Sequence, residues 1–555
     1  MKPRRNSRRS FVSGFAALGA ASAVPLAISA QDLGSANLSA GPAGLAAAAK
    51  PGTVVSNTSR LRTAWKIRTE AAAFQTSEAI PAHAINGDDI VNPSGGLSYS
   101  KGILQNALGE PNQEAYKAFK KACASGSVAD FNAVVMGGTA RFVNPQAAHA
   151  YVLEGADPHQ LTIAAPPAFS SAAMAADMAE VYWRALARDV PFTDYANSLV
   201  VIQACDDLTT FSAYPGVKLN GRVMPANIFR GQAAGDVPGP LISQFLWKPI
   251  PYGGTILPQL WRTYLPGSDH LTTYSEWLNL QNGIAPSATV KFDPTARYIR
   301  NLRDLAAFVR SDYPYEAFLN AAAILQGLGG AVASSTNPYA VPGTTTGFVN
   351  FGPVMVFDLV ARVASAALKA AWFQKWVVHR RIRPEQFGGR VHNHVTGAAS
   401  YPLHQDLLKS KALGNVFGAN GNYLLPMAYP EGAPLHPAYP AGHAAIAGAC
   451  ATVLKALFNE KAVLADPVMA SSDGLALQPV SGVSLTVGGE LDKLAANISL
   501  GRDAAGVHYR TDGIEGMLLG EKVAMEILRD HRRTLPERYP AFLFTGFSGA
   551  QMVVA

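Results

Sequence analysis

Basic and imidazole side chains gather in three short stretches of the last third of the sequence, and the first of these carries Lys375, His379 and Arg383. Spacings of four and eight residues place these side chains about 40° and 80° apart around a helix, so all three can share one stripe. Three such groups repel one another unless an anion lies between them. Arg380 and Arg381 point elsewhere and are compatible with a solvated basic face. Taken alone, the stripe is equally compatible with a functional and a solvated face.

The second stretch is Leu-His-Pro-Ala-Tyr-Pro-Ala-Gly-His at residues 435–443, and an apolar helical pattern over residues 444–458 follows it directly. Gly442 permits close backbone approach, and the free N–H groups at the start of a helix form an anion site. His443 can hydrogen-bond such an anion and exchange protons with it, because imidazole titrates near neutral pH. The alternative is a histidine that only bonds a loop carbonyl.

The third stretch, residues 497–512, combines a guanidinium, an imidazole and a carboxylate. Arg502 offers a planar fork suited to a tetrahedral oxyanion, and His508 can bind the central atom of that anion through a ring nitrogen. Asp512 lies one helical turn beyond His508, where it can orient the imidazole or pair with a neighbouring arginine. Both roles stay open for this carboxylate.

Helices must position these stretches, because helical periodicity recurs along the sequence while alternating strand patterns are scarce. The predicted helices cover residues 60–74, 115–124, 171–187, 304–328, 354–382, 444–458 and 514–532. Pro384 is expected to end the 354–382 helix. Since 50 Gly and 37 Pro residues punctuate the connections, we predict an all-α protein with long ordered loops. An N-terminal helical region (59–300) would precede a C-terminal helical bundle (301–555) that carries the site.

The net charge of +7 comes from 46 basic and 39 acidic residues, and five of the basic residues lie within the first nine positions. Residues 1–30 have the form of a twin-arginine export signal, with Ser-Arg-Arg-Ser-Phe-Val at 7–12, a short apolar run and small residues at 27–30. Without them, 41 basic residues stand against 39 acidic ones, so we expect no nucleic-acid partner. Residues 31–58 are expected to form a flexible lead-in, and the exported protein to be periplasmic or extracellular.

Composition restricts the other classes of protein. No apolar run reaches the roughly 18 residues of a membrane helix, so no membrane span is expected. Three Cys residues exclude a disulfide framework and a Cys-ligated zinc cluster, and we expect three buried thiols. His392, His394 and His404 cluster in sequence but lack nearby Cys or a compact carboxylate set, so we interpret them as loop histidines at the pocket mouth rather than zinc ligands.

In chain order, Lys-x7-Arg-Pro, Pro-Ala-Gly-His and Gly-Arg-x5-His resemble the motifs of the vanadium-dependent haloperoxidase and acid phosphatase superfamily. Stretches outside the pocket resemble the bromoperoxidases of red algae and their bacterial relatives, at residues 86–89, 144–147, 182–192, 242–245 and 376–381. The resemblance extends over about residues 60–545. The seven residues between Lys375 and Arg383 fit this branch better than the shorter spacing usual in phosphatases.

The resemblance implies a haloperoxidase-like fold of two helical bundles and a role for each pocket residue. Lys375, Arg383 and Arg502 would hold the equatorial oxygens of a vanadate cofactor. The Gly442 amide would donate a hydrogen bond to one oxygen, and His508 would bind the metal through its ring nitrogen.

The same resemblance implies peroxidase chemistry. His443 would be the acid–base residue that helps to deprotonate hydrogen peroxide, and His436 occupies the position at which bromide-oxidising members place a histidine near the bound peroxide. The reaction would oxidise bromide or iodide by two electrons, and the hypohalous product would halogenate a small organic acceptor. Vanadium would act as a Lewis acid without changing its oxidation state. Members of this type form homodimers or larger homo-oligomers.

One departure from the family pattern is Ala441, which stands where most members have a serine whose hydroxyl bonds a vanadate oxygen. A lost hydrogen bond to a charged group costs about 1.5–3 kcal/mol, or roughly ten- to a hundredfold in affinity, unless water replaces it. We therefore predict vanadate binding that is weakened but not abolished.

Two alternative functions stay open at this point. In an acid phosphatase the same pocket would take phosphate, with His508 as the nucleophile and His443 protonating the leaving alcohol. In a homologue without vanadate, the chain would be an isomerase, a cyclase or an inert oxyanion-binding scaffold, and Ala441 alone supports this reading.

Overall fold

The structure is a computed structural model that describes residues 57–555 except residues 342 and 538. The predicted export signal and residues 31–56 of the predicted lead-in lie outside the described residues. Helix α2 (Asn57–Ser77) includes the last two residues of that lead-in. Residues Thr69–Ala555 form one compact unit. The division of the chain near residue 300 stays a prediction.

Helices make up most of the described secondary structure, which confirms the all-α prediction. The first half contains α3 (Asp88–Val91), α4 (Gln113–Ser125), α5 (Val128–Asn132), α6 (Ala172–Leu186), α7 (Leu199–Thr210) and α8 (Tyr274–Gln281). The second half contains α9 (Leu302–Ser311), α10 (Glu316–Leu328), α11 (Pro353–Phe373), α12 (Pro384–Val395), α13 (Gln405–Leu408), α14 (Lys411–Asn420), α15 (Gly442–Leu457), α16 (Val487–Ala504) and α17 (Arg510–Arg532). None of the described helices is long and apolar enough to cross a membrane.

Strands are short and pair as antiparallel two-stranded ribbons. These are β1 (Ile250–Tyr252) with β2 (Thr255–Leu257), β3 (Val468–Ala470) with β4 (Leu477–Pro479), and β5 (Phe542–Thr545) with β6 (Gln551–Val554). In the last ribbon, Phe542 faces Val554 in the register. None of these ribbons carries a predicted site residue.

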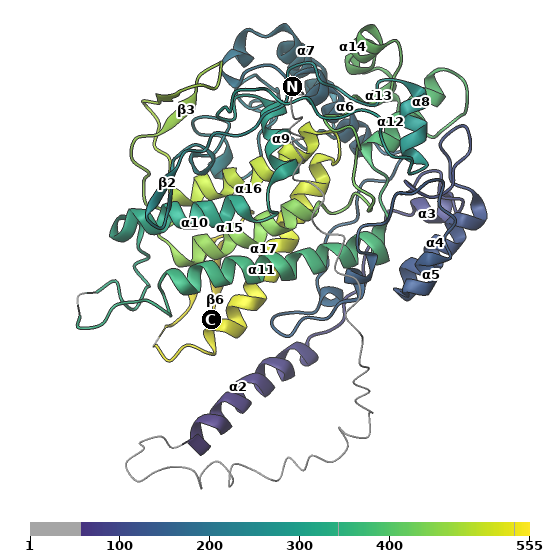
Figure 1. Ribbon diagram of the computed structural model, residues 1–555. Coiled ribbons are helices and arrows are strands. Elements are labelled where there is room, and N and C mark those ends of the chain that lie inside the picture. The colour runs from purple at the N-terminus through teal and green to yellow at the C-terminus, as the bar shows by residue number, and fades with distance from the viewer. Residues whose placement is uncertain (1–56, 342, 538) are drawn as a thin grey trace, which may run out of the picture. The chain divides into compact units, whose positions relative to one another are not determined.

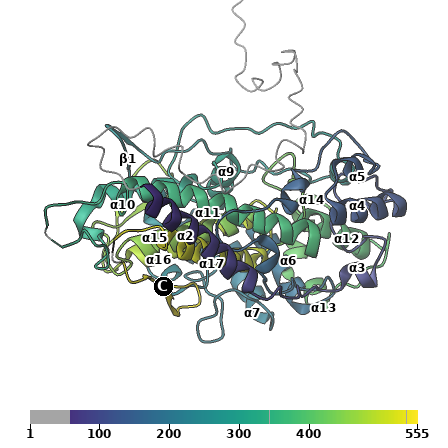
Figure 2. The same cartoon turned by 90° about the horizontal axis from the view of Figure 1, so that it is seen from below.

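Helix α15 is the centre of the C-terminal bundle, where it packs against α11, α16 and α17. Two views at right angles show these helices side by side (Figures 1 and 2). Small residues allow the close approach of α15 and α17. A Cβ on Gly448 would lie 2.2 Å from the carbonyl oxygen of Met517, and one on Gly520 would lie 2.0 Å from that of Ala445. The backbones therefore touch at positions that only glycine can occupy.

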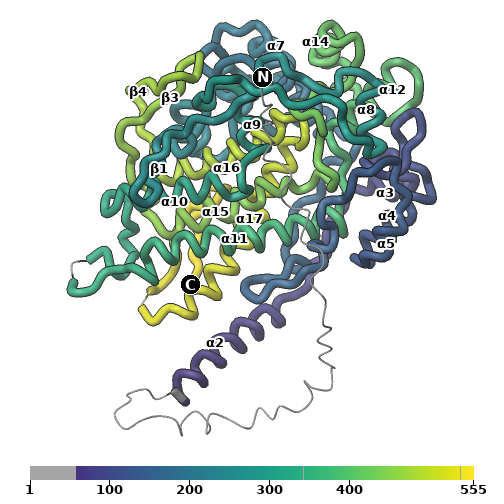
Figure 3. Tube along the Cα trace, in the orientation of Figure 1, coloured from purple at the N-terminus to yellow at the C-terminus, as the bar shows by residue number. Residues whose placement is uncertain are grey.

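A second group of helices, α6, α7, α13 and α14, packs together, and α6 also contacts α16. The connection from α7 to α8 is long and largely irregular, and its short helical turns pack on α16 (Figure 3). The fold thus consists of helical bundles joined by long ordered loops, as predicted. All three cysteines are buried free thiols, which confirms that expectation.

The predicted boundaries fail at two places near the site. The predicted 304–328 helix is two helices, α9 and α10, because Pro314 disfavours helical backbone at the residue before it. The predicted 354–382 helix passes from α11 into a π-helical turn, Gln374–His379, and ends there at Arg380, whose φ of 46° is left-handed. Pro384 does not end this helix but begins α12, at a position where its missing N–H is tolerated.

Candidate active site

Lys375 lies in the π-helical turn that follows α11, and its side chain is fully buried. Its Nζ donates hydrogen bonds to the carbonyl oxygens of Pro437 (2.9 Å) and Ala438 (2.7 Å). Burial, followed by the nearby charge of Arg383, holds the pKa of this lysine well below its usual value. A neighbouring anion would remove that penalty, because opposite charge favours the ammonium form.

Arg383 caps the start of α12 and is also fully buried. Its Nε donates to the carbonyl oxygen of His436 (2.8 Å), and its two terminal nitrogens reach the carbonyl oxygen of Val507 (2.6 Å) and Nδ1 of His436 (2.8 Å). One terminal nitrogen also lies 3.0 Å from Nε2 of His508. Burial lowers the pKa of the guanidinium to about 10.

His508 is oriented by a carboxylate, since its Nδ1 lies 2.8 Å from Oδ2 of Asp512. An ionised carboxylate only accepts hydrogen bonds, so the ring carries its proton on Nδ1 and presents the Nε2 lone pair toward Arg383. Burial and then the charges of Arg383, Lys375 and Arg502 keep the pKa of this imidazole well below its usual value. A neutral imidazole with a lone pair on its second ring nitrogen is the form that binds metal, and in His508 this lone pair faces Arg383.

Arg381 lies buried behind Asp512, contrary to the solvated position predicted for it. Its guanidinium pairs with Asp512 (2.6 Å) and with Asp177 of α6 (3.0 Å). Asp512 thus fills both roles left open by the sequence, because one oxygen orients His508 and the other bonds an arginine. Arg380 is only partly exposed, and it pairs with Asp89 at 2.9 Å. Burial of these charges is possible because a partner from the N-terminal half meets each of them.

The start of α15 lies beside these cations. Gly442 is its first residue, and a Cβ there would lie 3.1 Å from both Leu368 and Trp372 of α11. The N–H of Ala441 donates to the carbonyl oxygen of Asp512 (2.9 Å), which ties the helix start to α17. Among the described residues no side chain caps this helix from Ala441, and the first N–H groups of a helix lack intrahelical acceptors.

His443 is only partly buried, and its Nε2 lies 3.2 Å from Oδ1 of Asp312. Asp312 caps the end of α9 and is nearly fully buried, and its other oxygen has no partner within the described chain. The sequence stretch containing Asp312 looked helical, so this residue was missed as a functional candidate. Pro314 was the signal that could have placed Asp312 in a break between helices.

Arg502 reaches the pocket from the last turn of α16. One terminal nitrogen donates to the carbonyl oxygen of Val309 (2.7 Å), and the guanidinium carbon lies 5.7 Å from the ring centre of Tyr429. Its Nε is buried but has no hydrogen-bond partner in the part of the chain that the structure describes. An unpaired buried donor of this kind calls for an acceptor.

The remaining predicted histidines separate into two groups. His436 is buried, packs against Trp372 with 4.8 Å between ring centres and a 40° tilt between the rings, and bonds Arg383, so it belongs to the pocket. His379 turns away, since its ring meets Tyr439 edge-on at 4.8 Å and neither ring nitrogen has a partner among the described residues. The single stripe predicted for Lys375, His379 and Arg383 is therefore broken by the end of the helix at Arg380.

The three clustered histidines of the α12 region occupy local structural positions. Two stand in the last turn of α12, at the opposite end from Arg383, and the third caps α13, so they are not simply loop residues. Each accepts a backbone N–H on Nδ1, as seen for His392, His394 and His404. In the described residues no group of three His, Cys, Asp or Glu side chains is arranged to hold a metal ion.

The assembled donor set fits a tetrahedral oxyanion. Lys375, Arg383 and Arg502 bring three cations within electrostatic range of His508. Asp512, the carboxylate beside them, uses its oxygens on His508 and Arg381 and forms no ion pair with these three side chains in the described structure. The unpartnered Nε–H of Arg502 and the backbone N–H groups at the start of α15 offer hydrogen-bond donors for the oxygens of such an anion.

Comparisons with known proteins identify the family. Residues 356–536 match the domain family described as the VCPO second helical-bundle domain. The vanadium-dependent bromoperoxidase of Ascophyllum nodosum is 36% identical over 474 residues, which cover 81% of this chain and 85% of the relative. The chain belongs to the vanadium-dependent haloperoxidase family. It is therefore an oxidoreductase, as the sequence resemblance implied.

Two further relatives of this haloperoxidase agree in fold and extent. The vanadium-dependent bromoperoxidase of Corallina officinalis is 31% identical, with 87% of this chain and 96% of the relative covered. The homohexameric structure of the second vanadate-dependent bromoperoxidase of Ascophyllum nodosum superposes with a TM-score of 0.85 at 28% identity. It covers 92% of this chain and 97% of that chain. The match thus includes the N-terminal half as well as the bundle.

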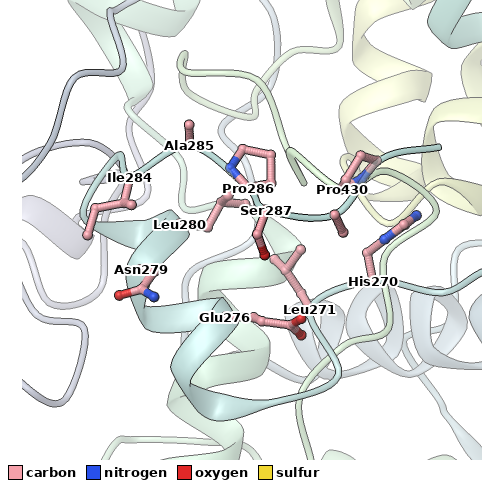
Figure 4. A pocket seen from close by; sticks show the side chains of 11 residues that line it. His270, Leu271, Glu276, Asn279, Leu280, Ile284, Ala285, Pro286, Ser287 and Pro430 are labelled. Carbon is pink, nitrogen blue, oxygen red and sulfur yellow. The ribbon is translucent and has the colours of Figure 1, made fainter.

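A separate cavity of about 240 Å³ lies beside Pro430, a few residues before the stretch 435–443 (Figure 4). Apolar side chains such as Leu271, Leu280 and Pro430 form much of its wall, and His270 and Glu276 add polar groups. None of the site residues predicted from the sequence lines this cavity.

Proposed function

We propose that this chain is a vanadate-dependent haloperoxidase that oxidises bromide or iodide with hydrogen peroxide and so halogenates a small organic acceptor. The observation that carries the proposal is the neutral His508, whose Nε2 lone pair faces Arg383 beside two further basic side chains, Lys375 and Arg502. That combination suits an anion whose central atom is a metal, because the anion needs the cations and the metal needs the lone pair.

Each holding residue has a separate role in this proposal. Lys375, Arg383 and Arg502 bind the oxygens of vanadate, Gly442 donates its N–H to one of them, and His508 binds the metal through Nε2. Vanadate, when bound, supplies a Lewis acid that polarises the peroxide without a change of oxidation state. The carbonyl oxygens that already hold Lys375 and Arg383 fix these cations before the anion arrives.

His443 acts as the general acid–base residue, because this imidazole has access to solvent and a carboxylate partner, Asp312. It accepts a proton from incoming hydrogen peroxide and returns it as the O–O bond breaks. Two electrons pass from the halide to the peroxide, and with one further proton taken up from solvent the products are hypohalous acid and water. His436 stays neutral, since burial and then Arg383 keep its pKa well below the usual value, and it borders the site of reaction beside Trp372.

Export and assembly complete the proposal. The twin-arginine motif at residues 7–12 supports export of the folded protein to the periplasm or the exterior. The homohexameric relative from Ascophyllum nodosum supports a homo-oligomer for this chain.

Two parallel assays test the function. Peroxide-dependent bromination of a diketone reporter is measured with and without added orthovanadate, and hydrolysis of nitrophenyl phosphate is measured on the same protein. We expect bromination that depends on vanadate. Hydrolysis that vanadate inhibits, with no bromination, would instead identify a phosphatase that uses His508 as nucleophile. Absence of both activities in a protein that binds no vanadium would identify a vanadate-free homologue.

A further inference from the structure

The segment of residues 431–438, here called the carbonyl segment, holds two of the pocket cations in place. The carbonyl oxygens of Pro437 and Ala438 accept from Lys375, and that of His436 accepts from Arg383. His436 itself belongs to the same segment. Any displacement of this backbone would therefore move both cations and the histidine together.

A buried lysine holds the beginning of the carbonyl segment. Lys101, from a loop of the N-terminal half, is 1% exposed. Its Nζ donates to the carbonyl oxygens of Glu431 (2.9 Å) and Ala433 (2.6 Å) and pairs with Glu385 at 2.5 Å. An ammonium has three donors, so every one of them is used on the segment or on its carboxylate partner.

Glu385 holds the same backbone from the other side. It lies in the first turn of α12, two residues after Arg383, and is 1% exposed. Its second oxygen accepts the N–H of Ala433 at 2.6 Å. Gly432 has a φ of 61°, and a Cβ on it would lie 2.0 Å from that carboxylate oxygen, so the backbone approaches as closely as glycine allows.

The chain adjoins a cavity just before the carbonyl segment. Pro430, the residue before the segment, lines the cavity of about 240 Å³ together with Leu280 (Figure 4). A Cβ on Gly432 would lie 2.9 Å from Leu280, so the segment itself is in close contact there. The hydrogen bonds of Lys101 and Glu385 therefore act where the chain passes from the edge of this cavity into close packing.

We propose that Lys101 and Glu385 are positioning residues of the active site. Their ion pair fixes the carbonyl segment and thereby sets the spacing of Lys375 and Arg383 and the place of His436. The proposal rests on the proposed function for its catalytic consequence. A buried ion pair adds little net stability compared with a well-packed apolar pair, so its effect should appear in the geometry of the pocket and not in the stability of the fold.

The test compares two matched ion pairs. The double variant Lys101→Met with Glu385→Leu removes the ion pair that holds the carbonyl segment, here called the clamp. Lys493→Met with Glu490→Leu removes a pair of the same 2.5 Å length and equal burial. The control pair lies on α16, nine and twelve residues before Arg502, or more than about 13 Å away along the helix. Glu385→Gln, which keeps the shape of the side chain, serves as the milder variant if the double variant does not fold.

The first readout needs no cofactor and no turnover. Hydrogen exchange of residues 431–438 in the protein without added oxyanion should be at least tenfold faster in the clamp variant and unchanged in the control. The second readout is the dissociation constant for orthovanadate and for inorganic phosphate. Both should rise at least tenfold in the clamp variant, less in Glu385→Gln and not in the control.

Three outcomes would overturn the proposal. These are equal exchange in the clamp and control variants, equal oxyanion affinity in both, or melting temperatures that fall together with affinity in the clamp variant alone. If the wild-type protein binds phosphate but never vanadate, the proposed function fails, while the exchange rates and the phosphate affinities still decide whether the clamp positions the pocket.

Discussion

The oxyanion pocket has two sides that differ in how fully their groups are shielded and bonded. The closed side is fully buried, and each of its side chains is held by backbone carbonyls or by a carboxylate. It consists of Lys375, Arg383 and His508. The open side consists of Arg502, His443 and Asp312. Arg502 and Asp312 have buried side chains that each keep one polar atom without a partner in the described chain, and His443 is partly exposed to solvent.

The difference separates two tasks of one site. Groups that are buried and fully bonded cannot reorient, so the closed side is built to bind an anion in a fixed geometry. A histidine that reaches solvent beside a carboxylate with one free oxygen can pass protons in and out, so the open side is built for turnover. Changes on the closed side should therefore affect binding, and changes on the open side should affect rate.

The largest effect is expected for His508→Ala on the closed side. Loss of the nitrogen that we propose binds the metal should weaken vanadate binding by more than about a hundredfold, since even loss of a partner behind such a ligand costs ten- to a hundredfold. Bromination should fall to background. Elemental analysis of vanadium after dialysis measures the binding. The control is His531→Ala, which truncates a different buried histidine that lies on α17. Stoichiometric vanadium in a folded His508→Ala protein would contradict the prediction.

His443→Ala on the open side is expected to lower kcat by roughly a hundred- to ten-thousandfold, the usual contribution of a general acid–base residue. Vanadate affinity should change by less than about threefold, because this imidazole is not part of the closed side. Steady-state bromination and vanadium binding are measured on the same preparation. His404→Ala, at a partly exposed histidine that caps α13, provides the control. A loss of binding that parallels the loss of rate would remove the distinction between the two sides.

Sequence patterns predicted the local structure around the candidate residues where the motif is short. Gly442 and His443 stand at the start of a helix that the apolar pattern after them predicts. His508 and Asp512 are one turn apart, and their hydrogen bond follows from that spacing. The family resemblance added the joint placement of the three stretches, which periodicity alone does not provide.

Partners far apart in sequence could not be predicted in the same way. Arg381 looked solvated because a charge at a helical position usually is, but Asp177 and Asp512 meet it from other elements. Helix α16 was not predicted from the sequence. Nearly all of its residues are buried, so it has no exposed polar face, and the alternation of apolar and polar residues that indicates a surface helix is absent. Asp312 pairs with His443 across 131 positions of chain, and no local pattern encodes such a pair.

Ala441→Ser tests the helix start that joins the two sides. A hydroxyl there can donate to a bound oxyanion, so vanadate affinity should rise about ten- to a hundredfold, corresponding to about 1.5–3 kcal/mol. Competition binding with phosphate measures the change. If the hydroxyl instead caps α15, the melting temperature would rise without any gain in affinity, and the predicted contact with the oxyanion would be wrong.

The smallest effect is expected at His379, behind the closed side, and it concerns stability. Burial lowers the pKa of His379 to about 3, and its ring meets Tyr439 without a hydrogen-bond partner among the described residues. The unfolded chain binds a proton here below pH of about 6.5 while the folded protein does not, so folding loses stability as the pH falls through this range. At pH 5 the loss amounts to about 2 kcal/mol.

His379→Phe should abolish this term, because phenylalanine keeps the edge-on contact with Tyr439 but has no proton to bind. The free energy of unfolding of the variant minus that of the wild type should therefore be about 2 kcal/mol larger at pH 5 than at pH 8, because only the wild type loses stability as the pH falls. Taking this difference cancels the opposite contribution of buried carboxyls such as Asp503, whose pKa is raised to about 8. Denaturant titrations at both pH values measure it. An equal difference at the two pH values would mean that His379 gains a proton in the folded state, and that the closed side is more open to solvent than its burial indicates.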